Sequence, residues 1–93
     1  MNEAPNLDCM TLDPDELFRW GREAETHPIA TARTLFPDTT LLRRVQVTRA
    51  LGAYAVNKSV AMKCRLRGAI ATAEMYERIC DNIYKALPDW ARW

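Results

Sequence analysis

The 93-residue chain is poor in residues that interrupt helices and in residues that build common catalytic sites. It has only three glycines and one histidine, His27, which precedes a proline in a predicted loop. It contains no glycine-rich phosphate loop, no paired-cysteine motif and no nucleophile elbow. Its carboxylates fall at helix caps and in i,i+4 pairs, which explains them without catalysis. We therefore expect no catalytic residues and a protein that is not an enzyme.

Long apolar runs are also missing. The longest stretch without a charged residue is Ala50 to Asn57, only eight residues, whereas a transmembrane helix needs about 20 apolar residues. The first ten residues, MNEAPNLDCM, are acidic and lack the apolar run of a secretory signal. These features predict no membrane partner and a cytoplasmic location.

The three cysteines, Cys9, Cys64 and Cys80, are too few and too widely spaced for a disulfide framework. Together with His27 they would make four potential zinc ligands, but no two of them have a ligand-like spacing. We expect no metal site and no cofactor. Cys64 and Cys80 fall at helical positions and are predicted to be small core residues.

Caps and prolines place the first two helices. Residues 1–12 show no periodic pattern and are predicted to be a flexible N-terminal arm, followed by a single helical domain at 13–93. Asp13 and Pro14 begin a helix at about 14–25. Its apolar stripe is Leu17, Trp20, Gly21 and Ala24. A short helix at 28–36 is expected to turn four residues inward: Ile29, Ala32, Leu35 and Phe36.

The longest predicted helix covers residues 39–67, because nothing forces it to end before Gly68. The last helix covers 69–87 and has regularly spaced apolar residues. These are Ala69, Ala73, Tyr76, Cys80, Ile83 and Leu87, with Ile79 widening the stripe. The predicted fold is all-α, a small bundle of three principal helices in which the long central helix forms an antiparallel hairpin with the last.

The helix at 39–67 would be about 43 Å long, which is more than a compact domain of this size readily covers. Its apolar residues face several directions, which is typical of a surrounded helix. One apolar line contains Leu42, Val45, Arg49, Val56, Val60 and Lys63. Another side carries the small residues Gly52, Ala55 and Ser59, and we expect the last helix to fill that groove. The remaining surface predicts a homodimer through this helix.

Charge is distributed unevenly along the chain. Residues 1–38 carry a net −5, residues 39–73 a net +7 with no acid, and residues 74–93 a net −1. One interpretation is a nucleic-acid surface, because phosphates attract clustered basic side chains. It would use Arg43, Arg44, Arg49, Lys63 and Arg67. These residues fall on two sides of a helical wheel, which favours a second interpretation: the acidic N-terminal segment packs against the basic helix and neutralises it.

The tryptophans allow two interpretations. Trp20 lies on the first helix's apolar stripe and is expected in the core. Trp90 and Trp93 lie three residues apart, and the hairpin would bring them to the start of the long helix. They either form a lid over the open end of the hairpin or stack on Arg44 or Arg49 as an exposed surface for a partner.

These observations predict a non-enzymatic helical interaction protein. It would bind a protein partner or itself through the long helix and the C-terminal tryptophan tail, using Trp90, Trp93, Arg44 and Arg49. The alternative is a nucleic-acid-binding or regulatory module that uses the acid-free helix at 39–67.

Overall fold

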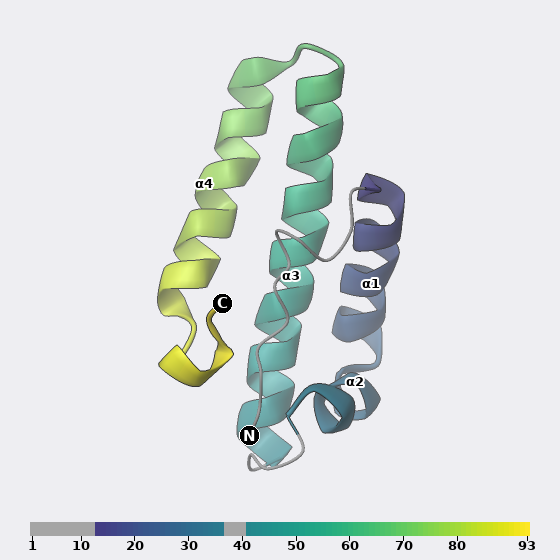
Figure 1. The fold of residues 1–93 in the computed structure, drawn as a ribbon, viewed down its shortest axis with the longest axis vertical. Coiled ribbons are helices and arrows are strands. Elements are labelled where there is room, and N and C mark those ends of the chain that lie inside the picture. Colours follow the sequence, from purple (N-terminus) through teal and green to yellow (C-terminus); the bar gives the residue numbers. More distant parts are fainter. Residues whose placement is uncertain (1–12, 37–40) are drawn as a thin grey trace.

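A computed structural model of the chain describes residues 13–36 and 41–93. These residues form four α-helices and one short 3-10 helix (Figure 1). The elements are α1 (Pro14–Thr26), α2 (Pro28–Leu35), α3 (Leu41–Leu66), α4 (Ile70–Ala86) and η1 (Asp89–Ala91). The predicted all-α bundle, including its short second helix, is confirmed. The arm predicted at 1–12 lies outside the described residues.

The long helix α3 is the centre of the fold. Helices α1, α2 and α4 all pack against it, and Figure 1 shows α1 and α4 on opposite sides of α3. Gly68 turns the chain between α3 and α4 with a φ of 79°, a left-handed conformation that glycine adopts without strain. The amide of Ala69 donates to the carbonyl of Cys64 at 2.8 Å and closes the end of α3. The predicted antiparallel hairpin is therefore confirmed.

Helix α1 begins where its cap predicts. The Asp13 carboxylate accepts a hydrogen bond from the amide of Asp15 at 2.9 Å, and Pro14 occupies the first turn. Leu17, Gly21 and Ala24 are buried against α3, while Trp20 is half-buried beside the core. The predicted apolar stripe of this helix is thus confirmed.

The closest approach between helices is where α1 crosses α3. A Cβ atom on Gly52 would lie 2.8 Å from the carbonyl oxygen of Gly21, and one on Gly21 would lie 2.8 Å from that of Gly52. The same position on Gly21 is 3.0 Å from Cβ of Ala55. The prediction that the last helix fills the groove at Gly52 and Ala55 is therefore wrong. Helix α1 fills it, because Gly21 brings a backbone without a side chain to the crossing point.

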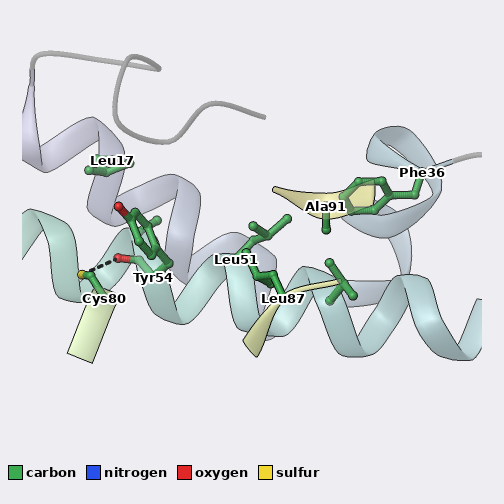
Figure 2. Packing of buried hydrophobic residues seen from close by; sticks show 9 residues of the cluster. Leu17, Phe36, Leu51, Tyr54, Cys80, Leu87 and Ala91 are labelled. Atoms are coloured by element: carbon green, nitrogen blue, oxygen red, sulfur yellow. Dashed lines mark hydrogen bonds between the residues drawn. The ribbon is translucent and has the colours of Figure 1, made fainter. Parts of the chain in front are cut away.

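The core lies on one side of α3, and every helix contributes to it (Figure 2). Its buried members are Leu17, Phe36, Val47, Leu51, Tyr54, Ala55, Cys80, Leu87 and Ala91. The thiol of Cys80 donates to the carbonyl of Tyr54 at 3.6 Å. Cys64 and Cys80 are both buried thiols, as predicted for core residues. Burial of each large apolar side chain contributes roughly 1.5–3 kcal/mol.

Two residues predicted to face the core are exposed instead. Ile29 is 50% exposed and Ile79 is 38% exposed. Helix α2 has only eight residues and buries Ala32, so its first turn projects beyond the core. On α4 the buried line runs through Ala73 and Cys80, and none of the described elements covers the side that carries Ile79.

Candidate interaction surfaces

The C-terminal tryptophans are held by aromatic contacts within their own chain. The Trp90 ring meets Phe36 edge to face, with centroids 5.0 Å apart. Trp93 makes similar contacts with Tyr54 at 4.9 Å and Tyr84 at 4.8 Å. The Tyr84 hydroxyl also donates to the carbonyl of Trp93 at 2.6 Å. These contacts tie the tail to α2, α3 and α4, which is the arrangement of a lid over the end of the hairpin.

The arginine beside this lid is one residue away from the predicted position. The guanidinium of Arg43 lies 5.9 Å from the Trp90 ring centroid, a cation–π distance. Sequence reasoning had assigned that contact to Arg44 or Arg49. One residue turns a helix by about 100°, so a small error in hairpin register selects a different side chain. Arg44 is half-buried and Arg49 is exposed.

Two basic residues of α3 are neutralised by acids of neighbouring helices. The ammonium of Lys63 lies 2.5 Å from the Asp15 carboxylate of α1. Arg65 makes two hydrogen bonds of 2.6 Å to the Glu77 carboxylate of α4. The hydrogen bond from Lys63 lowers the pKa of Asp15, and that from Arg65 lowers the pKa of Glu77. The sequence predicted that the acidic N-terminal segment would pair with the long helix, as Asp15 does. It did not predict the pair that Arg65 makes with Glu77 of α4.

The five residues predicted for a nucleic-acid surface are not brought together. Arg43 lies at the tryptophan lid and Lys63 lies against α1. Arg67 lies in the α3–α4 turn, with its guanidinium nitrogen 3.7 Å from the sulfur of Cys64. Arg49 lines a cavity at the opposite end of α3. Arg44 is half-buried and follows Arg43 in α3, so the five residues are spread along and around one helix.

An exposed apolar surface lies where α2 meets α3. A shallow cavity of about 310 Å³ is lined there by Pro28, Ile29, Leu42, Val45 and Arg49, which we call the α2–α3 surface. Leu42 of α3 is 70% exposed and Ile29 of α2 is 50% exposed, and both side chains are large and apolar. Contiguous exposed apolar side chains of this kind are typical of interaction sites.

Sequence reasoning identified only part of this surface. Arg49 was predicted as a partner-binding residue, and Leu42 and Val45 belonged to one of the apolar lines of the long helix. Ile29 was assigned to the core. The apolar line that contains Leu42 and Val45 already indicated this surface. The long helix has apolar residues on several sides, and three neighbouring elements cannot cover all of these sides.

Other kinds of site find no support among residues 13–36 and 41–93. No group of three or more histidine, cysteine, aspartate or glutamate side chains is placed there to hold a metal ion. Within the same residues, no helix has the length and apolar content that a membrane span requires.

Comparison with protein-family models, with curated proteins and with solved structures finds no match for this chain. Its function is therefore inferred from the geometry of the described residues alone.

Proposed function

We propose that the chain is a non-enzymatic interaction protein that binds a protein partner, or a second copy of itself, through the α2–α3 surface. The observation that carries this proposal is the 70% exposure of Leu42 on a helix, beside the half-exposed Ile29. An exposed leucine leaves roughly 1.5–3 kcal/mol of burial free energy unused. A partner that covers Leu42 and Ile29 would gain it.

The charge at this surface also supports binding of a protein. Arg49 lines the same cavity, is exposed, and makes no ion pair with any residue in 13–36 or 41–93. Arginine is enriched at the residues that dominate binding energy in interfaces, where its long stem packs and its guanidinium donates several hydrogen bonds. Leu42 and Arg49 together thus provide an apolar anchor and a charged anchor.

The tryptophan tail has less support as the interface than it had from the sequence. Trp90 and Trp93 both use their ring edges and faces on neighbours in the same chain. A partner that took over these contacts would first have to open the lid. We therefore assign the tail to stabilising the fold and place the interface at the α2–α3 surface.

Site-specific photo-cross-linking tests this proposal. We would replace Leu42 with benzoylphenylalanine, irradiate the protein in an extract of its source organism, and identify adducts by mass spectrometry. We expect a discrete covalent adduct with one protein or with a second copy. The matched control places the same cross-linker at Met75, which is 46% exposed on α4. The same adducts from both positions, or none from position 42, would refute the proposal.

The nucleic-acid alternative remains as a second hypothesis with weaker support. Its strongest point is the absence of acids between residues 39 and 73, and its weakness is that Lys63 and Arg65 already pair with carboxylates. A mobility-shift titration at two salt concentrations separates the two hypotheses. Binding that weakens steeply with salt would support nucleic acid, because each phosphate contact releases a counterion that was bound to the nucleic acid.

We also propose a cytoplasmic location for this interaction. Neither Cys64 nor Cys80 forms a disulfide with another described residue, which suits a reducing compartment. Fractionation of the source cells with an antibody to the protein would test the location, and recovery in an oxidising compartment would contradict it.

A further inference from the structure

None of the described elements lies over one face of α3, and this face extends the α2–α3 surface along the helix. Helix α1 covers the side of α3 that carries Gly52 and Ala55, and α4 covers the side that carries Tyr54. At about 100° per residue, the face between these two sides contains one continuous line. We call this line the open stripe: Leu42, Val45, Arg49, Ala53 and Val60, with Val56 at its edge, where its side chain lies against Gly21 of α1. Apart from the exposed Leu42 and Arg49, its residues are half-buried.

The open stripe is complementary to itself when it is reversed. If two copies of α3 lie antiparallel across this face, Leu42 packs opposite Val60 of the second copy. Arg49 then lies opposite Ala53, and Val45 faces the edge of the stripe near Val56. Each large side chain meets a smaller or equal one, as close packing of two helices requires. From Leu42 to Val60 the stripe is about 27 Å long, which is enough for an interface of standard size once the flanking helices are included.

The charges agree with the same register. Glu25 of α1 lies against α3, because a Cβ atom on Gly52 would be 2.9 Å from the Glu25 Cγ atom. Neither Glu25 nor Arg49 forms an ion pair with the described residues. In the antiparallel register Arg49 of one copy faces Ala53 of the other, at the level of Gly52 along the helix, and its long side chain extends across the interface to Glu25 on the adjoining α1. Two-fold symmetry repeats this Arg49–Glu25 pair, so the interface contains it twice.

We infer that the occupant of this face is a second copy of the chain, packed antiparallel α3 to α3 with reciprocal Arg49–Glu25 pairs. This inference rests on the proposed function and names its partner. A parallel arrangement would instead bring Arg49 of the two copies together, and like charges in direct opposition destabilise an interface.

A charge-exchange experiment tests the inference. We would measure mass by light scattering or sedimentation over about 1–200 µM for the unaltered protein, for Arg49→Glu, for Glu25→Arg and for an equimolar mixture of the two variants. Each variant alone places like charges at both pairs and should dimerise at least tenfold more weakly. The mixture restores two opposite-charge pairs and should form a heterodimer of near-normal affinity. High salt should reduce the difference in dimerisation affinity between each variant alone and the mixture.

The controls separate loss of folding from loss of association. Circular dichroism must show unchanged helix content in both variants. Arg78→Glu, on the exposed side of α4, is the matched charge reversal and should leave dimerisation unchanged.

A monomeric unaltered protein at 200 µM would overturn the inference. If the unaltered protein dimerises but the mixture of the two variants does not, the antiparallel register is wrong. The proposed function fails separately, if the cross-linker at position 42 captures nothing. Capture of a different protein at position 42 by a monomeric chain would leave the proposed function standing and the present inference refuted.

Discussion

Helices α1 and α4 leave two sides of α3 uncovered, and the rest of the described chain covers only one of them. On one side the chain returns, and Trp90 and Trp93 close over Phe36, Tyr54 and Tyr84. On the other side no described element returns, and Leu42 stays 70% exposed. Both sides are apolar with arginine nearby, so composition alone does not distinguish them. The difference is whether the chain covers its own surface, and we expect covered residues to affect stability and open residues to affect association.

The largest expected effect is on the covered side. Trp93→Ala removes edge-to-face contacts with Tyr54 and Tyr84 and should lower the free energy of unfolding by about 3 kcal/mol. Leu42→Ala, on the open side, should change it by less than about 0.5 kcal/mol. Urea unfolding measures both, at micromolar protein because association stabilises the folded state at higher concentration. An equal loss of unfolding free energy in the two variants would contradict the distinction between the covered and the open side of α3.

The next largest effect on stability is expected at Gly52 of α3, and the adjacent Ala53 provides the comparison. Gly52→Ala should destabilise the fold by about 2 kcal/mol, although alanine favours helix over glycine by about 1 kcal/mol. The reason is that the new Cβ atom would lie 2.8 Å from a backbone oxygen of α1, which cannot move aside by changing a rotamer. Ala53→Ser, one residue further on the open stripe, should cost less than about 0.5 kcal/mol. Thermal unfolding of the two variants measures the difference, and a neutral Gly52→Ala would show that the helices separate easily.

A smaller effect of opposite sign concerns a hydroxyl group. The Thr48 hydroxyl is fully buried and has no hydrogen-bond partner among residues 13–36 and 41–93. Thr48→Val replaces it with a methyl group of similar shape and should raise the free energy of unfolding by about 1 kcal/mol. Ser59 provides the matched control, because its buried hydroxyl donates to the carbonyl of Val56 at 2.7 Å. Ser59→Ala should therefore not stabilise the protein, and a gain there as large as at Thr48 would contradict this explanation.

The smallest effect is on the pH dependence of stability. The pKa values of Asp15 and Glu77 are lowered from 3.8 and 4.5 by Lys63 and Arg65. Because the folded pKa lies below the unfolded one, the stabilisation is complete above these ordinary values and is lost as pH falls through the folded pKa. Lys63→Met with Arg65→Met should flatten the acid side of a stability curve between pH 5 and 2. Both pairs are exposed, so 1 M salt should reduce the difference, and an unchanged curve would show that the pairs do not contribute.

Much of the fold could be predicted because its signals are local. Asp13 with Pro14 marks a helix start, Gly68 marks a turn, and the spacing of Ala73, Cys80 and Leu87 marks the buried side of α4. Such signals depend on residues within one or two turns of each other. They predict elements and their apolar sides without any knowledge of which element packs on which.

The pairing of elements could not be predicted, because it depends on residues far apart in the chain. Gly52 was recognised as a point of close approach, but only the structure shows that Gly21 meets it. Arg43 lies over Trp90, whereas the sequence suggested Arg44 or Arg49, since the register of the hairpin decides which side chain faces the tail. The exposure of Ile29 likewise follows from how short α2 is and where it sits on α3.

The contact between Gly21 and Gly52 has a consequence for how α1 finds its place. At that point two backbones touch, so no rotamer change can absorb a mismatch. If α1 slid by one turn along α3, a side chain would enter the space of a few ångströms between the helices and push them apart. The two glycines therefore fix the register of α1 along the axis of α3. A chain that keeps this short distance between α1 and α3 would need small residues at both places, and that pair would help to identify a relative whose other residues have diverged.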